Sequence, residues 1–325
     1  MSKKAMSGLL AGLFTLLVVI ATIPMAVIAF SAPAPPPAMA TSAAHNKRDH
    51  IRDLPEPRHF QARDGTSLQY YAYPADTNKV AVLIHGSAFP APSMHALAQA
   101  LRGAGVTTYA LDIRGHGGSG RRGDIDYIGQ IDDDLADFVA QLGPVKNGET
   151  RTLVGFSAGG GFTIRFAGGP YGELFDRYVL LSPILPGSPT LRPSSGGWIN
   201  VSLPRVVTIN WLDRLGIHGF DGVPVLSYAI SPDLAPSVTA SYSYRLTLNF
   251  GASRAYESYL RNIRRPAAIL VGGADEQEFA DQFAPLLRRL GVNIPVTLVP
   301  NMTHTDMIGA PQALREVVRT ISPES

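Results

Sequence analysis

The residues that could carry out a reaction centre on one serine. Ser157 stands in Gly155-Phe156-Ser157-Ala158-Gly159, a Gly-x-Ser-x-Gly pattern between a strand-like run and a helical pattern. A serine on a sharp strand-to-helix turn projects its hydroxyl beyond the sheet, and glycines are favoured there because a Cβ would clash. We therefore predict that Ser157 is a nucleophile for acyl transfer. The alternative is a glycine-rich helix start that only packs closely.

A second turn could stabilise the negative charge that such an attack creates. His85-Gly86-Ser87 follows the apolar run that ends at Ile84. An oxyanion can accept hydrogen bonds from a backbone N–H of such a loop and from the N–H of the residue after the nucleophile. We predict the backbone N–H groups of Ser87 and Ala158 as the two donors. We expect the His85 side chain to brace the loop rather than react.

The serine also needs a general base, and two histidines lie C-terminal to it, His218 and His304. His218 falls in a long irregular region. His304 follows the last predicted strand, where a loop could reach Ser157. We therefore predict His304 as the base.

Asp275 is the predicted carboxylate that orients His304. It follows the strand 267–271, and a strand-end aspartate can reach across to hold the histidine tautomer and stabilise the imidazolium. The other interpretation of Asp275 is a helix cap, since Glu278 stands three residues later. Glu276 is an alternative carboxylate, and Asp306 is too close in sequence to His304 to be attractive.

Alternating strand and helix patterns surround these residues. Short apolar runs predict strands at 68–73, 79–84, 106–111, 152–155, 178–181, 267–271 and 296–299. Helical patterns lie at 94–102, 128–142, 158–167, 279–290 and 311–321. This alternation predicts an α/β fold with a mostly parallel central sheet covered by helices on both faces.

One region interrupts the alternation. Residues 184–265 are rich in Pro, Ser, Tyr and Gly and contain both tryptophans, Trp198 and Trp211. The segment is too long for an ordinary connection, so we predict an inserted cap, or lid. Sites in open α/β sheets lie beyond the carboxyl ends of the strands, where a cap would roof them. The sheet domain then consists of 45–183 and 266–325.

The N-terminus predicts targeting to a membrane. Lys3 and Lys4 precede an uncharged, mostly apolar run from Gly8 to Phe30, long enough to cross a hydrocarbon core of roughly 30 Å as a helix. The lysines favour translocation of the rest of the chain, so we expect an anchor with the catalytic domain on the periplasmic or extracytoplasmic side. The alternative is secretion after cleavage near Ala38-Met39-Ala40. Residues 1–44 thus form an anchor or signal peptide and a Pro/Ala-rich spacer.

Composition excludes several classes of protein. The 325 residues contain no cysteine, which excludes disulfides, zinc–thiolate sites, iron–sulfur clusters and thiol nucleophiles. A net charge of +2 without a basic stripe gives no reason to expect nucleic acid as a partner. The predicted chemistry requires no metal and no organic cofactor. Oligomeric state is not encoded in any pattern that we find.

The order Ser157, Asp275, His304 resembles that of the α/β-hydrolase superfamily. The segment Leu111-Asp112-Ile113-Arg114-Gly115-His116-Gly117-Gly118-Ser119 narrows the resemblance, because it looks like the Asp-x-Arg-Gly-His-Gly-x-Ser loop of the monoacylglycerol lipase, lysophospholipase and serine aminopeptidase S33-like branch. The resemblance covers about residues 60–322. We expect this polar loop to hold geometry rather than to react.

The resemblance implies a serine hydrolase that cleaves carboxylic esters through an acyl-enzyme. The expected substrates are small-molecule or lipid esters with an apolar acyl group, such as monoacylglycerols or lysophospholipids. Two alternatives stay open: a serine peptidase or transacylase with the same triad, and a catalytically idle, membrane-anchored binding module.

Overall fold

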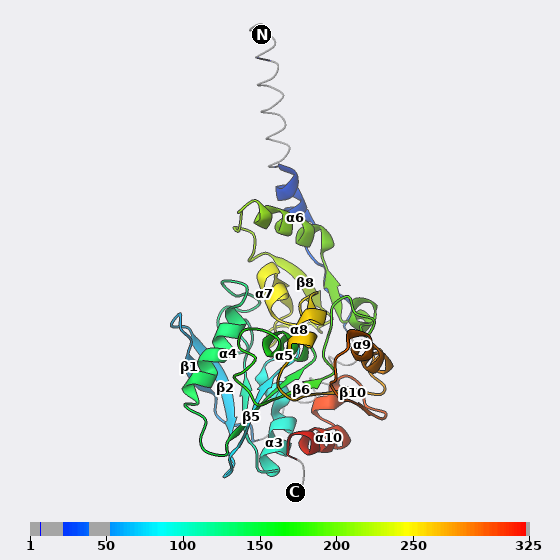
Figure 1. The fold of residues 1–325 in the computed structure, drawn as a ribbon. Coiled ribbons are helices and arrows are strands. Elements are labelled where there is room, and N and C mark those ends of the chain that lie inside the picture. Colours follow the sequence, from blue (N-terminus) through cyan, green and yellow to red (C-terminus); the bar gives the residue numbers. More distant parts are fainter. Residues whose placement is uncertain (1–6, 8–21, 39–52, 323–325) are drawn as a thin grey trace.

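The computed structural model describes residues 7, 22–38 and 53–322, and it is built around one large sheet (Figure 1). In spatial order its strands are β1 (Arg58–Gln61), β2 (Ser67–Tyr73), β4 (Thr107–Leu111), β3 (Lys79–Ile84), β5 (Thr150–Phe156), β6 (Arg177–Leu181), β10 (Ala267–Gly272) and β11 (Val296–Val299). The pairs β1–β2 and β2–β4 are antiparallel, and the other neighbours are parallel. The predicted mostly parallel α/β sheet is confirmed.

Helices cover both faces of this sheet. On one face lie α3 (His95–Gly103) and α10 (Pro311–Ile321), and on the other lie α4 (Gln130–Gln141), α5 (Ala158–Ala167) and α9 (Phe283–Leu290). The central strand β3 explains why both faces need cover. Its Ala81 and Leu83 join the core beneath α3 and α10, whereas Val82 and Ile84 join the core beneath α4 and α5. Such a continuous apolar run is stable only when it is buried on both sides.

Most of residues 184–265 lie beyond the carboxyl ends of the parallel strands, but 256–262 pack on α5 within the sheet domain. A small antiparallel sheet contains β7 (Ile199–Val201), β8 (Pro224–Tyr228) and β9 (Ser241–Ser243), and α6 (Leu203–Arg214) connects β7 to β8. Two short helices, α7 (Tyr244–Asn249) and α8 (Tyr256–Asn262), then lead back toward the main sheet. We refer to 184–265 as the cap.

Some element boundaries differ from the sequence predictions. The helix predicted at 279–290 begins at Phe283, because Ala280–Gln282 form a separate 3-10 turn. The helix predicted at 128–142 begins at Gln130, after Gly129 with a φ of 107°. The edge strand β1 was not predicted, since its sequence alternates charged and polar residues with a single buried phenylalanine, Phe60. Further 3-10 turns are Ala91–Met94, Pro193–Gly197 and Thr305–Ile308.

The N-terminal region is described in part. Residues 22–30 are helical, and residues 31–38 run along the cap (Figure 1). Within the described ranges no helix has the length and apolar character needed to cross a bilayer. Residues 8–21 of the predicted anchor, and Met39 and Ala40 of the predicted cleavage site, lie outside the described residues.

Candidate active site

Ser157 occupies a strained turn between β5 and α5. Its φ of 56° and ψ of −120° are unusual for a residue with a side chain, and they direct the hydroxyl away from both elements. The flanking glycines allow this turn. A Cβ on Gly155 would lie 2.2 Å from the Gly159 carbonyl oxygen, and a Cβ on Gly159 would lie 2.3 Å from that of His85. The Gly-x-Ser-x-Gly pattern therefore has a steric cause.

His304 lies on the loop after β11 and faces the serine. Its Nε2 is 2.9 Å from the Ser157 Oγ, and its Nδ1 is 2.8 Å from the Asp275 Oδ2. All three residues are buried. Because a carboxylate at Nδ1 favours the tautomer that carries its proton there, the lone pair of Nε2 faces the serine hydroxyl. This arrangement can accept the serine proton.

The other oxygen of Asp275 anchors the carboxylate. Asp275 Oδ1 accepts hydrogen bonds from the backbone N–H groups of Gln277 at 2.9 Å and Glu278 at 3.1 Å. Burial acts to raise the pKa of Asp275, but His304, the Gln277 N–H and Ser182 together hold the pKa below its usual value. Asp275 thus forms the backbone bonds of a cap and also orients His304. The two sequence interpretations are not exclusive.

The other carboxylates and the other histidine considered from the sequence are not part of this hydrogen-bonded chain. The Glu276 Oε2 accepts from the backbone N–H of His304 at 3.0 Å, and the Asp306 Oδ2 accepts from the N–H and hydroxyl of Thr303 at 2.9 and 2.6 Å. Both carboxylates therefore support the loop that carries His304. His218 is exposed beside Asp213, outside the pocket.

The loop after β3 lies across from the serine. His85 braces it, as predicted: its Nδ1 is 2.7 Å from the Gly86 carbonyl oxygen, and its Nε2 accepts from the N–H of Ile113 at 3.1 Å. Burial lowers the pKa of His85 to about 4, which keeps it neutral. The predicted donors Ser87 and Ala158 stand on this loop and at the first residue of α5, where a helical N–H lacks a partner four residues earlier.

The polar loop 111–119 is structural. The buried Arg114 guanidinium pairs with Asp134 at 2.7 Å and with Asp64 at 3.0 Å. The His116 Nε2 bonds the Tyr242 hydroxyl of the cap, and burial holds the pKa of His116 well below its usual value. These side chains connect the loop to α4 and to the cap, and none of them lines the pocket.

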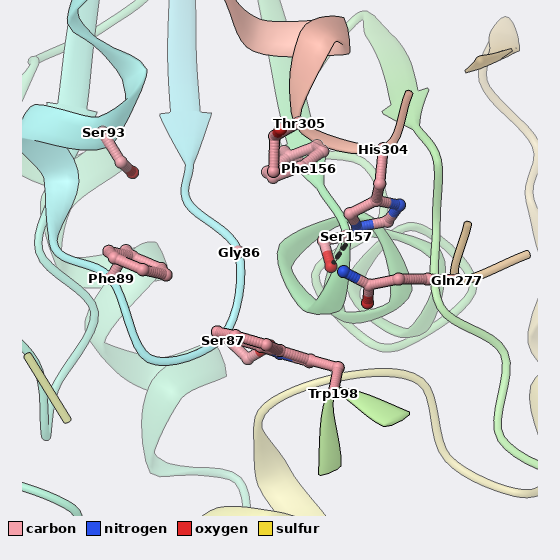
Figure 2. Close-up of a pocket in the computed structure, with 10 residues that line it drawn as sticks. All are labelled: Gly86, Ser87, Phe89, Ser93, Phe156, Ser157, Trp198, Gln277, His304 and Thr305. Atoms are coloured by element: carbon pink, nitrogen blue, oxygen red, sulfur yellow. Dashed lines mark hydrogen bonds between the residues drawn. The ribbon is translucent and has the colours of Figure 1, made fainter. Parts of the chain in front are cut away.

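A narrow pocket encloses the serine (Figure 2). It is lined by Gly86, Ser87, Phe89, Ser93, Phe156, Ser157, Trp198, Gln277, His304 and Thr305. The cavity measures about 30 Å³, room for a few water molecules at most. Three of the lining side chains, Phe89, Phe156 and Trp198, are aromatic, and none of the lining side chains is acidic.

Sequence analysis missed two polar contacts that join this pocket to the cap. The Trp198 indole stacks on Phe89, with ring centroids 6.1 Å apart, and donates from Nε1 to the Ser87 Oγ at 3.2 Å. The Gln277 Oε1 accepts from the Ser195 hydroxyl at 3.0 Å, and its amide nitrogen points toward Ser157 (Figure 2). Neither residue stands in a recognisable motif, so the sequence held no signal for them beyond the presence of a tryptophan in the cap.

Within the part of the chain that the structure describes, two groups of side chains each bring three possible metal-ligating atoms within 4.8 Å of one another. One is Asp275, Glu278 and His304, but both His304 nitrogens already face Asp275 and Ser157, so a metal ion would have to displace those bonds. The other, Asp213, His218 and Asp221, lies partly exposed at the end of α6, away from the serine.

The fold and this serine–histidine–aspartate geometry define an α/β-hydrolase. Residues 75–307 match the family model described as serine aminopeptidase, S33, and the chain belongs to that family. It is 30% identical over 236 residues to a monoacylglycerol lipase of Mycolicibacterium smegmatis. The alignment covers 70% of this chain and 75% of the relative. The chain is therefore a hydrolase of the monoacylglycerol lipase branch.

Solved structures share the fold. A monoacylglycerol lipase of Paleococcus ferrophilus superposes with a TM-score of 0.60 at 22% identity, over 79% of this chain and 99% of that one. A soluble variant of the monoglyceride lipase of Saccharomyces cerevisiae superposes with a TM-score of 0.61 at 18% identity, over 84% and 95%.

Proposed function

We propose that this protein hydrolyses carboxylic esters through a Ser157–His304–Asp275 triad and an acyl-enzyme. His304 takes the proton of the Ser157 hydroxyl as Oγ attacks the ester carbonyl, and then passes it to the leaving alcohol. Water, deprotonated by His304, next attacks the acyl-enzyme; the acid is released as the acyl–Oγ bond breaks, and His304 returns the proton to Ser157 Oγ. The observation that carries this proposal is the continuous chain of hydrogen bonds from Oγ to Nε2 and from Nδ1 to Asp275.

The tetrahedral intermediate would be held by the backbone N–H groups of Ser87 and Ala158. Both residues border the serine: Ser87 lies on the loop after β3, and Ala158 is the first residue of α5. Donors that are already in place cost no reorganisation when charge develops on the oxygen, and one such donor contributes on the order of 100- to 1000-fold in rate.

The proposed substrate is a monoacylglycerol or lysophospholipid. The aromatic walls formed by Phe89, Phe156 and Trp198 suit an apolar acyl chain, and the similar curated relative is named a monoacylglycerol lipase. The narrow pocket does not hold such a chain in this conformation, so we propose that the cap, which contributes Trp198, moves aside for substrate.

A serine peptidase or transacylase uses the same triad, and the family description names an aminopeptidase. An aminopeptidase must bind the ammonium group of a peptide, which calls for a carboxylate in the pocket, and none lines this one. A catalytically idle binding module has no need of a base within hydrogen-bond reach of a serine. The geometry therefore favours esterase chemistry over an aminopeptidase and over an idle module.

We also propose that the N-terminus is a retained anchor, with the hydrolase domain on the translocated side of the membrane. Residues 31–34 are bonded to the cap: the carbonyl oxygens of Ser31, Pro33 and Ala34 accept from Ser202, Ser227 and Asn200 at 2.6, 3.0 and 2.8 Å. Cleavage near Ala38-Met39-Ala40 would remove all three bonds, so this packing favours retention over secretion.

The substrate proposal is tested with the purified full chain in detergent. We expect hydrolysis of a long-chain monoacylglycerol and of a lysophospholipid, and no cleavage of an aminoacyl-p-nitroanilide. Cleavage of the anilide as the faster reaction would contradict the ester assignment. Adding an alcohol acceptor separates hydrolysis from transacylation, because only a transacylase gives a new ester as its main product.

A further inference from the structure

One polar side chain in the pocket is used neither by the proposed triad nor by the proposed oxyanion donors. Gln277 lines the pocket beside Ser157 and is 4% exposed, and Figure 2 shows its amide nitrogen pointing toward the serine. Among the residues that the structure describes, none accepts a hydrogen bond from this nitrogen. A desolvated N–H donor without an acceptor is unfavourable, so we expect the acceptor to come from a molecule that enters the pocket.

Both the backbone and the side chain of Gln277 are fixed by hydrogen bonds. Its N–H donates to the Asp275 Oδ1 at 2.9 Å, and its carbonyl oxygen accepts from the N–H of Arg192 at 3.0 Å. Its side-chain Oε1 accepts at 3.0 Å from the hydroxyl of Ser195, a buried residue of the cap. Because the oxygen of the amide is bonded to Ser195, the nitrogen is left facing the pocket. The donor is therefore in place before a substrate binds.

The place of Gln277 indicates which part of an ester it meets. Figure 2 shows Gln277 and His304 on one side of Ser157, and Ser87 and Phe89 on the other. In the proposed reaction His304 passes its proton to the leaving alcohol, so the alcohol part of the ester lies on the side of His304. The proposed oxyanion donor Ser87 and the aromatic ring of Phe89 lie across from it. Gln277 therefore borders the alcohol part of a bound ester rather than its acyl chain.

We propose that Gln277 is a specificity-determining residue whose Nε2 donates a hydrogen bond to a hydroxyl group on the leaving alcohol, one carbon beyond the carbon that bears the ester oxygen. We refer to this group as the vicinal hydroxyl. Monoacylglycerols and lysophospholipids both carry one, whereas a plain alkyl ester does not. A plain alkyl ester would leave the amide without an acceptor, which is how a polar group in a pocket selects against an analogue. This inference rests on the proposed ester hydrolysis and names the feature of the alcohol that the pocket selects.

The test compares two esters of equal size. 2-Hydroxyethyl butanoate and propyl butanoate have the same number of non-hydrogen atoms, and they differ only in a terminal hydroxyl against a methyl group. The measured quantity is the ratio of kcat/KM for the hydroxyethyl ester to kcat/KM for the propyl ester, with the purified full chain. Because both esters are measured on the same sample, this ratio does not depend on the fraction of a variant that is folded.

Gln277→Met keeps the length of the side chain and removes the donor. We expect it to lower the ratio by about tenfold relative to the wild type, because one hydrogen bond between uncharged groups is lost with the hydroxyethyl ester alone. Ser195→Ala removes the hydroxyl that holds Oε1, so the amide is free to turn. We expect a smaller fall in the ratio, of about threefold, in this variant.

Ser188→Ala is the matched control. This serine also lies in the cap and is buried, but its hydroxyl is bonded to the Thr190 Oγ1 at 2.7 Å rather than to Gln277. The ratio should therefore stay at the wild-type value. A fall in Ser188→Ala as large as that in Gln277→Met would overturn the proposal, because any disturbance of the cap would then have the same effect.

An unchanged ratio in Gln277→Met would also overturn the proposal. If the rates on both esters then fell together, Gln277 would instead be a donor to the oxyanion, which every ester forms. Both esters would still be cleaved by the wild type, so the proposed function would stand. If the wild type cleaved neither ester, the proposed function would fail, and this inference would fail with it.

Discussion

The edge of the parallel sheet and the cap above it contribute to the same pocket, but they hold their side chains differently. At the sheet edge, Ser157, Asp275 and His304 follow the ends of β5, β10 and β11, whose positions are fixed by ladders of backbone hydrogen bonds. The cap reaches the pocket through side-chain contacts such as Trp198 with Ser87, and through single backbone bonds such as that from the Thr239 N–H to the Ala88 carbonyl oxygen, but not through a strand ladder. The difference teaches that the sheet ladders position the reacting groups, whereas individual contacts position the cap above them.

The largest expected effect concerns the sheet edge. Ser157→Ala should lower ester hydrolysis by roughly 10⁴-fold or more, because the nucleophile is lost, and should leave the unfolding temperature nearly unchanged. Ser93→Ala is a matched control, since this serine also lines the pocket but has no role in the proposed reaction. Steady-state rates on a short-chain ester check both variants. Equal rates for Ser157→Ala and the wild type would place the chemistry elsewhere.

Asp275→Asn should lower kcat by roughly 10³- to 10⁴-fold, because an amide favours the wrong histidine tautomer. Glu276→Gln keeps an oxygen that can accept from the His304 N–H, so we expect a change of only a few-fold. If the two variants lost activity equally, Asp275 would not be the orienting carboxylate.

A smaller effect concerns the pH dependence of folding. His85 is neutral when folded, with a pKa lowered by burial to about 4 against 6.5 for the free side chain. As the pH falls from 6.5 toward 4, the side chain binds a proton in the unfolded chain but not in the folded chain. Burial of neutral His85 therefore lowers the free energy of unfolding by about 3 kcal/mol over this range.

The measurement is the free energy of unfolding of wild type and His85→Gln in urea, at pH 7 and pH 4.5. We expect the difference in free energy of unfolding between the wild type and His85→Gln to be smaller at pH 4.5 than at pH 7. The raised pKa values of the buried Asp112 and Asp134, each about 6, act with the opposite sign, but they are present in both proteins and cancel in the difference. An advantage that stays constant with pH would contradict a buried, neutral His85.

The smallest expected effect concerns a contact between the cap and the loop after β3. Tyr242→Phe removes the hydroxyl that receives the Ala88 N–H at 2.8 Å and bonds His116, which should cost about 1–3 kcal/mol and also change KM, because Ala88 adjoins Ser87. Tyr178→Phe removes a buried bond to Gly172 far from the cap, so it should lower stability alone. Thermal unfolding and KM together distinguish the two. If KM changed equally in both variants, the cap contact would have no special role.

The contrast between the sheet edge and the cap also explains which parts of the structure could be predicted from the sequence. Strands β3 and β11 and helices α5 and α10 were predicted at their observed bounds, because buried parallel strands and helix starts leave strong local patterns. The residues that follow the strand ends were also predictable. Parallel order brings their carboxyl ends to one edge, which is why Ser157, Asp275 and His304 meet.

The interior of the cap was not predictable. Its strands β7 and β9 span three residues each, too short for a periodic pattern. The 3-10 turn Pro193–Gly197 contains four consecutive residues with positive φ, from Ser194 to Gly197. The contacts of Trp198 and Gln277 join segments about eighty or more residues apart, and only the folded chain reveals them.

The most direct test of the proposed reaction centre is labelling of the folded full chain with a fluorophosphonate, followed by mapping of the modified residue by mass spectrometry. The probe reacts only with a serine that a neighbouring base activates. We predict a single adduct on Ser157 that disappears in His304→Ala and persists in Ser93→Ala. Labelling that survives in His304→Ala, or an adduct on another serine, would contradict the account.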